Sequence, residues 1–235
     1  MDRRADAHEL LDGPLHDHDA VVANLRDLRR LNRLFGGVAL SRWGVNRLLD
    51  GAAGTTTVLD VGTGGADIPV ALLADARRRG RDLTVQAVDH RPEIVAAARS
   101  ARPSLDHVAG LQLDVADGTA LPYPDASFDV AHASLVVHHL DAEEAVRFLA
   151  ELRRVSRLGV VVNELDRGRF AWTVTWLTTR LLARGRFTRH DAPTSVRRAY
   201  TARELEGLLR RAGLVPAATR TIPGHRYAVV AVPAE

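Results

Sequence analysis

The chain has 235 residues, with 32 basic and 29 acidic side chains and no cysteine. This length allows one domain with a sizeable core, and the missing cysteines exclude disulfides, thiolate nucleophiles and cytosine C5-methylation through a cysteine adduct. Every basic residue is arginine, as in GC-rich bacterial genomes, and the arginines are interspersed with acids, so the charge predicts no nucleic-acid partner. The charged N-terminus lacks an apolar leader and no apolar run could span a bilayer, so we expect a cytoplasmic protein without stable membrane insertion.

The first 54 residues predict a polar tail followed by two helices. Residues 1–18 are expected to form a solvated, partly frayed tail, although its histidines could also form a metal-binding tract: His8, His16 and His18. Apolar residues recur at helical spacing over 19–35 and again over 38–49. Asn32, Arg33 and Trp43 are expected to make core contacts or lie in solvent, with contact to a ligand as the alternative.

A strand, a glycine turn and a helix follow. The apolar run from Val58 to Val61 predicts a buried strand. The glycines of residues 62–65 then allow the backbone to approach a ligand above the helix that begins near Asp67. Nicotinamide and flavin enzymes share this pattern, and a structural turn with Asp67 as the helix N-cap is a further alternative. The turn alone therefore indicates a nucleotide-binding fold without identifying the ligand.

The charges around the glycine turn distinguish between the possible ligands. A dinucleotide places its pyrophosphate at the helix N-terminus, where the amide dipoles favour an anion. Here Asp60 ends the strand and Asp67 begins the helix, and both carboxylates would repel a pyrophosphate. They would attract the ammonium and the sulfonium of S-adenosylmethionine (SAM). The acids therefore favour SAM over a dinucleotide.

Two further segments carry acids near strand ends. Residues 83–89 predict a strand that ends in Asp89, which could accept hydrogen bonds from both hydroxyls of a ribose. Residues 114–129 read Asp-Val-Ala-Asp-Gly-Thr-Ala-Leu-Pro-Tyr-Pro-Asp-Ala-Ser-Phe-Asp and lead into an apolar strand over 128–136.

In this order, the three segments resemble the class I SAM-dependent methyltransferases over about residues 55–165. The acid-x-Gly-x-Gly motif of that family is found in Asp60-Val-Gly-Thr-Gly64, with Ala66 where the family often has a third glycine. The third segment resembles the one in which an aspartate binds the adenine amino group, and its distance from Leu-Pro favours Asp117 over Asp114. The resemblance implies this cofactor-binding set: Asp60, Gly62, Thr63, Gly64, Asp89, His90, Asp117, Gly118 and Ser134.

The resemblance also implies an α/β, Rossmann-like fold with a seven-stranded sheet. Residues 1–54 would then be the tail and lid helices over the SAM pocket, and residues 55–235 would be the methyltransferase domain. The apolar patterns agree with this fold. They predict the remaining strands over 108–113, 158–165, 214–222 and 227–232, and helices over 92–101, 142–155 and 201–212.

Residues 166–200 form an insertion after the fifth strand, where the family places acceptor-binding elements. An apolar, aromatic stripe predicts a helix there that binds a hydrophobic or aromatic acceptor, forms a homodimer contact or packs on the core: Phe170, Trp172, Trp176, Leu177, Leu181 and Leu182. Arg197, Arg198 and Tyr200 could bind a polar group of the acceptor, or be surface arginines and a packed tyrosine. The run from Arg189 to Thr201 loosely resembles secondary-metabolism methyltransferases found beside type III polyketide synthases, which methylate phenolic or quinol lipids.

A general base is expected at the end of the fourth strand. Ser134-Leu-Val-Val-His138-His139-Leu resembles a motif of small-molecule methyltransferases, including ubiquinone and menaquinone methylases. We place His138 nearer the acceptor and His139 in loop hydrogen bonding, with the reverse left open, because a neutral imidazole can take a phenol proton. Glu164 is another candidate base or acceptor anchor. His190 is a further candidate for the base. Asp191 would then set its tautomer, or the pair would only stabilise the loop.

These features predict a SAM-dependent methyltransferase that O-methylates a phenolic or quinol-like small molecule. C-methylation of a quinone precursor is the alternative within the class, with Glu164 or a histidine removing the ring proton. A nicotinamide-dependent oxidoreductase and a SAM-binding protein without catalysis are the alternatives outside it. The fourth strand lacks the Asn/Asp-Pro-Pro-Tyr run of amino-methylases, and no carboxylate cluster of magnesium-dependent catechol methylases is evident, so we predict no metal.

Overall fold

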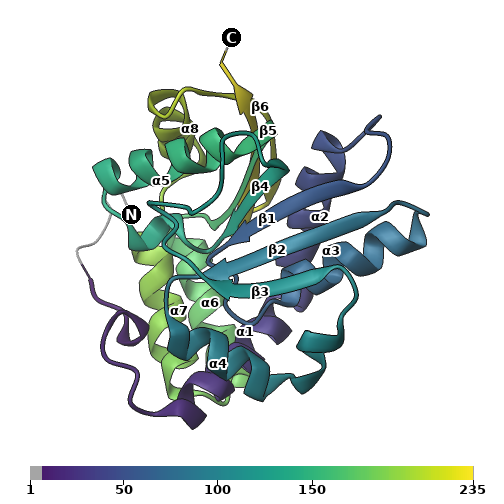
Figure 1. The fold of residues 1–235 in the computed structure, drawn as a ribbon. Helices are drawn as coiled ribbons and strands as arrows, with labels where there is room; N and C mark the ends of the chain where they lie inside the picture. Colours follow the sequence, from purple (N-terminus) through teal and green to yellow (C-terminus); the bar gives the residue numbers. More distant parts are fainter. Residues whose placement is uncertain (1–6, 235) are drawn as a thin grey trace.

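The computed structural model describes residues 7–234, which fold around one mixed β-sheet (Figure 1). The strands lie in the order β3-β2-β1-β4-β5-β7-β6, with β7 antiparallel to both of its neighbours and the other pairs parallel. Their bounds are β1 Thr56–Val61, β2 Leu83–Asp89, β3 Leu111–Val115, β4 Phe128–Ser134, β5 Ser156–Leu165, β6 Leu214–Ile222 and β7 Arg226–Pro233. This is the predicted Rossmann-like fold with seven strands, and its order reverses direction between β1 and β4, where such sheets bind ligands.

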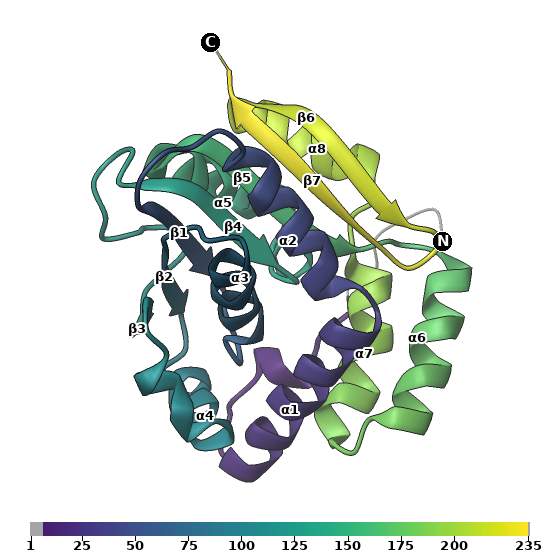
Figure 2. The same ribbon diagram turned by 90° about the vertical axis from the view of Figure 1, so that its right-hand side faces the viewer.

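Helices cover both faces of the sheet (Figures 1 and 2). Helices α2 and α3 pack on one face, and α5 and α8 pack on the other, each through a buried apolar cluster. Helix α1 contacts α4 and also α7, which pairs with α6. The bounds are α1 His18–Leu34, α2 Gly37–Leu48, α3 Asp67–Arg78, α4 Pro92–Ala101, α5 Ala142–Val155, α6 Arg169–Leu182, α7 Arg186–Arg198 and α8 Ala202–Arg211, with short 3-10 turns at Leu10–Asp12, Pro103–His107 and Val137–His139.

Most of the predicted elements occur within a few residues of their expected bounds. The third strand begins at Leu111 rather than at residue 108, because a 3-10 turn precedes it and Leu111 N donates to Val108 O at 3.0 Å. Thr201 caps α8 in the predicted capping box with Glu204. No helix in the described part of the chain is long and apolar enough to cross a membrane.

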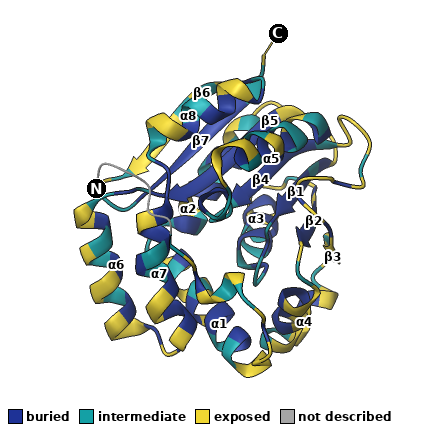
Figure 3. Cartoon of the chain, turned by 90° about the vertical axis from the view of Figure 1, so that its left-hand side faces the viewer, coloured by how far each residue is buried: buried dark blue, intermediate teal, exposed yellow. Residues whose placement is uncertain are grey.

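The insertion folds as two helices, whereas the sequence predicts one. The break between α6 and α7 is held by Asp27 of α1, whose Oδ2 accepts from the backbone N of Arg184 and of Gly185 at 2.8 and 2.7 Å. Most of the predicted stripe faces outward from α6 (Figure 3): Phe170, Trp176, Leu177, Leu181 and Leu182 are exposed, and Trp172 is half-buried. The stripe is therefore not packed on the core of this chain, and the face of α6 toward the interior carries Ala171, Thr175 and Thr179.

The N-terminal segment is packed where the sequence predicts a frayed tail. Residues 8–13, which we call the N-terminal strap, run between α7 and the end of β2. Asp191 accepts from the backbone N of Leu10 and of Leu11 at 2.8 and 3.1 Å, and Arg91 donates to the carbonyls of Leu11 and Gly13 at 2.7 and 2.9 Å. The prediction is thus wrong for residues 8–13, while residues 1–6 lie outside the described range. The tail histidines His8, His16 and His18 are exposed and, in residues 7–234, form no cluster of metal-ligand atoms.

Candidate active site

A cavity of about 410 Å³ lies at the carboxyl ends of β1, β2 and β4. Its walls come from the glycine turn, the end of β2, the segment after β3 and the end of β4. All nine side chains or glycines of the predicted cofactor-binding set line this cavity: Asp60, Gly62, Thr63, Gly64, Asp89, His90, Asp117, Gly118 and Ser134. The structure therefore brings together residues that are up to 74 positions apart, from Asp60 to Ser134.

The glycine turn is shaped by its neighbours. Gly62 has a left-handed φ of +72°, and a Cβ added there would lie 2.3 Å from Cγ2 of Val136. Asp89 Oδ2 accepts from Gly64 N at 3.0 Å, so the carboxylate that ends β2 also holds the turn. Asp67 does not cap the following helix: Ala66 is the N-cap residue, and Asp67 instead accepts from Nδ2 of Asn32 at 3.2 Å.

We expect Gly62→Ala to destabilise the fold more than Gly51→Ala does. Both glycines have left-handed φ values, +72° and +79°, so the backbone strain is common to both variants. A Cβ at Gly51 meets no atom within 4 Å, whereas one at Gly62 overlaps Val136. Overpacking of this kind costs about 1–3 kcal/mol. Chemical denaturation of the two variants measures the difference, and equal free energies of unfolding would contradict the close approach at Gly62.

The acidic side chains of the larger cavity favour a cationic ligand. Burial raises the pKa of both Asp67 and Asp89, and the nearby Asp60 adds to each rise. A bound cation would offset these costs, whereas an anion would increase them. Thr63 also lines this cavity, and its buried hydroxyl oxygen has no hydrogen-bond partner within the protein. A bound ligand could supply that partner. These residues fit the ammonium, sulfonium and ribose of SAM.

Asp60 has a buried partner that the sequence analysis missed. Its Oδ1 lies 2.5 Å from Nδ1 of His132, and Nε2 of that ring lies 2.8 Å from the Ser41 hydroxyl. His132 sits on β4 in register with Asp60 on β1. A buried histidine in the middle of an apolar strand, opposite the motif acid, is the sequence signal that could have revealed this pair. One oxygen of Asp60 is thus held by the protein core while the residue lines the cavity.

The structure separates the two candidates for the adenine-binding aspartate. Asp117 lines the larger cavity, and its Oδ1 accepts from the backbone N and the hydroxyl of Thr119 at 2.8 and 2.7 Å, which lowers its pKa. Asp114 accepts from Nε2 of Gln86 and does not line the cavity. Gly118 has no room for a side chain, because a Cβ would lie 2.7 Å from the ring of Phe148.

A second cavity of about 110 Å³ adjoins the first. The two share several walls, namely Leu11, Asn24, Leu28, Asn32, Leu135 and His139. The smaller cavity is completed by the strap, α6, α7, the end of β5 and the turn between β6 and β7. Of the lid residues named from the sequence, only Asn32 reaches the cavities; Arg33 is exposed, and Trp43 packs against the α2–α3 cluster under Arg220.

His138 is the buried imidazole of the smaller cavity. Its Nδ1 bonds Oε2 of Glu164 at 2.8 Å, and Oε1 of Glu164 accepts from Val137 N at 2.8 Å. Burial alone would raise the pKa of Glu164, but the charge and hydrogen bond of His138 outweigh it and hold that pKa below its ordinary value. Glu164 lines neither cavity, and its carboxylate holds the ring of His138 from the core side.

His139 lies at the boundary between the cavities, because it lines both. Its Nδ1 bonds Oδ1 of Asp12 at 2.9 Å, and its backbone carbonyl accepts from Arg198. The ring is therefore tied to the strap rather than to its own loop. His190 is more than half exposed, pairs with its neighbour Asp191 and lines neither cavity, so the structure places it outside the site.

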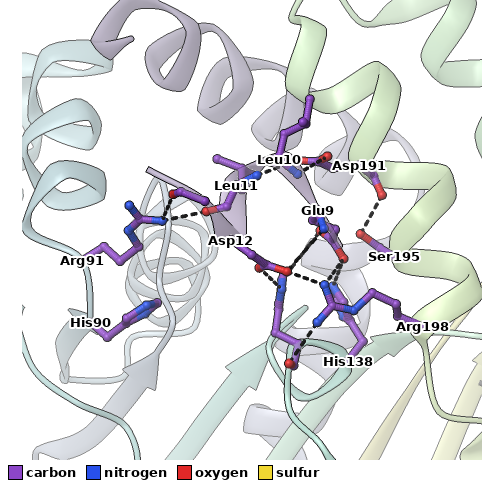
Figure 4. A network of polar contacts seen from close by, with 12 residues as sticks. Glu9, Leu10, Leu11, Asp12, His90, Arg91, His138, Asp191, Ser195 and Arg198 are labelled. Atoms are coloured by element: carbon purple, nitrogen blue, oxygen red, sulfur yellow. Dashed lines mark hydrogen bonds and ion pairs between the residues drawn. The ribbon is translucent and has the colours of Figure 1, made fainter. Parts of the chain in front are cut away.

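The strap brings Glu9 to His138 (Figure 4). Oε1 of Glu9 lies 3.6 Å from Nε2 of His138, and burial raises the pKa of Glu9 to about 7. Glu9, His138 and His139 each offer a metal-ligand atom within 4.8 Å of the others. However, Nη1 of Arg198 lies 3.6 Å from the same oxygen of Glu9 and also contacts Asp12, so the arginine already pairs with these two carboxylates. The absence of a metal at this cluster stays a prediction.

The remaining candidates from the insertion hold the structure together. Arg198 binds the strap and the carbonyl of His139, and the Tyr200 hydroxyl donates to Leu140 O at 3.0 Å. Arg197 is exposed. The smaller cavity also has polar residues that the sequence analysis did not single out, from the strap, α1, α6, α7, the turn between β6 and β7 and the start of β7: Glu9, Asn24, Thr175, Thr178, Thr179, Thr188, Ser195, His225 and Arg226.

The chain is similar to known methyltransferases. The model of a methyltransferase-domain family matches residues 59–162. The ubiquinone/menaquinone biosynthesis C-methyltransferase UbiE of Citrifermentans bemidjiense is 27% identical over 141 residues, which are 54% of this chain and 58% of that protein. The chain thus spans less than two thirds of the length of this relative.

Two solved structures share the fold. A SAM dependent methyltransferase from Aquifex aeolicus superimposes with a TM-score of 0.65 at 20% identity and covers 90% of this chain and 98% of its own. An O-methyltransferase family protein from Burkholderia thailandensis gives a TM-score of 0.67 at 17% identity, over 94% of this chain and 61% of its own. Together with the matched family and the acidic cavity, these similarities leave the nicotinamide alternative without support. Residues 59–162 therefore match a methyltransferase-domain family, in a fold shared with SAM-dependent methyltransferases, and the residues of the larger cavity fit SAM as the cofactor.

Proposed function

We propose that the protein transfers the methyl group of SAM to a phenolic or quinol-like small molecule, with oxygen as the methylated atom. The observation that carries this proposal is the placement of His138, a buried imidazole in a small cavity that shares walls with the cofactor cavity. Leu28, Leu31, Phe35 and Leu165 give this cavity an apolar lining that suits an aromatic ring.

The site residues would act by orientation and by proton transfer. SAM supplies an activated methyl group on a sulfonium. The walls shared by the two cavities hold the acceptor beside the cofactor, and orientation of this kind is worth up to about 7–11 kcal/mol in intramolecular models. His138 would take the proton of the acceptor hydroxyl, because Glu164 holds its Nδ1 and stabilises the imidazolium that forms. Glu9 faces the same imidazole as a carboxylate with a pKa near neutrality and could receive the proton in turn.

C-methylation of a quinone precursor is the second candidate. The curated relative named above is a C-methyltransferase, and this specific similarity favours carbon as the methylated atom. The same imidazole would then remove the ring proton after methyl transfer. Both candidates need the acceptor in the smaller cavity, so they differ in the product rather than in the residues.

A methylation assay over a panel of phenols, quinols and quinone precursors tests the proposal. We expect SAM-dependent methylation of at least one aromatic hydroxyl compound, and NMR of the product locates the methyl group on oxygen or on carbon. Calorimetry should show SAM binding and no useful affinity for NAD or NADH, because the acids at the glycine turn repel a diphosphate. If SAM binds and no acceptor across a broad panel is methylated, a SAM-binding role without catalysis replaces the proposal.

A further inference from the structure

Unpartnered polar atoms gather in the smaller cavity. Five buried side-chain nitrogen or oxygen atoms in residues 7–234 lack a hydrogen-bond partner, and all five belong to residues that line the two cavities. Thr63 lines the larger cavity only. The other four line the smaller one: Oδ1 of Asn24, Oγ1 of Thr175, Nδ1 of His225, and Oε1 of Glu9, which has ion-pair contacts at 3.6 Å with His138 and Arg198. Because a buried polar group without a partner is costly, this concentration points to a ligand with complementary polar groups.

Three of these residues come from elements other than the turn that carries His138. Asn24 is on α1, Thr175 is on α6, and His225 is in the turn between β6 and β7. We call them the acceptor-atom cluster. Three separate elements thus bring these residues to one cavity, so their unpartnered atoms do not arise from the geometry of a single turn.

The chemistry of these atoms selects for a hydrogen-bond donor. An amide oxygen accepts only, and an unprotonated imidazole nitrogen accepts. Burial, followed by the charge of Arg226, lowers the pKa of His225 to about 4, so its ring is neutral near neutral pH, and Nδ1 accepts in the tautomer that carries its proton on Nε2. The Nδ2 of Asn24 already donates to the Thr188 hydroxyl at 3.1 Å, so the unpartnered atom of this amide is its accepting oxygen. The Thr175 hydroxyl can both accept and donate.

From this arrangement we propose that the acceptor-atom cluster is a subsite for a second hydroxyl or amino group on the acceptor. This inference rests on the proposed function, since it describes the acceptor of that reaction. One hydroxyl of the ring faces His138 and is methylated, while a second donor group binds Asn24, Thr175 and His225. The substrates are therefore aromatic compounds with at least two donor groups, rather than simple phenols.

Two threonines of α6 provide a matched pair for the test. Thr175 and Thr178 both line the smaller cavity. The hydroxyl of Thr178 already donates to the carbonyl of Val174 at 2.8 Å, whereas that of Thr175 has no partner. Valine has nearly the shape of threonine without the hydroxyl. Thr175→Val therefore removes a group of the subsite, and Thr178→Val removes an equivalent group outside it.

Calorimetry with the full chain saturated with S-adenosylhomocysteine, which has no methyl group to transfer, measures acceptor binding without turnover. The probes are hydroquinone, catechol and resorcinol, each compared with phenol and with its own monomethyl ether. We expect at least one diol to bind about tenfold or more tightly than both reference compounds. This preference should fall severalfold in Thr175→Val and in His225→Phe and stay unchanged in Thr178→Val, with melting temperatures confirming that each variant folds.

Equal affinities for diols and simple phenols in the unmodified protein would overturn the subsite, as would an equal loss of preference in Thr175→Val and Thr178→Val. Absence of binding by every probe would overturn it as well. These outcomes are distinct from failure of the proposed function. Methylation of phenols without any preference for a second donor supports methyl transfer and overturns only the subsite. Diol-selective binding without methylation supports the subsite and overturns methyl transfer.

Discussion

Replacing His138 with alanine is expected to lower kcat by about 10²–10⁴-fold, the usual contribution of a positioned general base. The imidazole lines the acceptor cavity, and Glu164 holds its Nδ1 at 2.8 Å, so its loss removes the group that takes the acceptor proton. SAM affinity should be retained, because His138 does not line the larger cavity. Steady-state kinetics with saturating SAM, together with calorimetry for SAM, measures both quantities.

His190→Ala is the matched control for this prediction. His190 also pairs with a carboxylate, that of Asp191 at 2.8 Å, but it is exposed and lines neither cavity. Its removal should leave kcat within about twofold of the unmodified enzyme, as for most surface changes. If His138→Ala keeps the original rate, proton transfer must be assigned elsewhere, and His139 at the boundary of the two cavities becomes the next residue to replace.

Asp89→Ala should weaken SAM binding by about 10–100-fold. A hydrogen bond to a charged group contributes about 1.5–3 kcal/mol, and the carboxylate at the end of β2 is placed for the ribose hydroxyls while it also holds Gly64 N and Arg91 N. Its negative charge also favours the cationic cofactor. Calorimetry with SAM at neutral pH gives the dissociation constant directly.

Asp114→Ala provides the comparison, because Asp114 lies near the end of the neighbouring strand β3 but outside the cavity. Its replacement should leave the SAM dissociation constant nearly unchanged. Melting temperatures of both variants show whether any change comes from lost stability of the glycine turn. Equal affinities of the Asp89 and Asp114 variants for SAM would remove Asp89 from the cofactor site.

The α/β body could be predicted from the sequence because its signals are local. β-branched and apolar runs bounded by turns mark each strand, Thr201 and Glu204 mark the start of α8, and the glycines of residues 62–65 mark the ligand turn. Parallel strands end at one edge of the sheet, so acids after successive strands had to meet there. The whole predicted cofactor set lines one cavity for this reason.

The strap could not be predicted, because nothing periodic distinguishes it from a solvated tail. Its position depends on partners far along the chain: Asp191 accepts from the backbone of Leu10 and Leu11, 181 and 180 residues earlier. A polar segment of this kind is ordered by its backbone hydrogen bonds rather than by an apolar face. Glu9 was missed for the same reason.

The orientation of α6 shows a different limit of pattern analysis. The apolar stripe predicts the buried face of an amphipathic helix, yet that stripe is mostly exposed and the threonine face is turned inward. This is possible because Thr178 and Thr179 donate their hydroxyls to carbonyls of their own helix, at 2.8 Å each. Hydrophobic periodicity counts threonine as polar and so assigns the wrong face.

The common walls of the two cavities have a consequence for inhibitor chemistry. Asn32, Leu135 and His139 border both spaces, so single side chains lie between the two cavities. A bisubstrate compound that joins an adenosyl group to a dihydroxyphenyl ring could occupy both at once. Such a compound loses its translational freedom once instead of twice, and its affinity can therefore exceed that of either half by orders of magnitude.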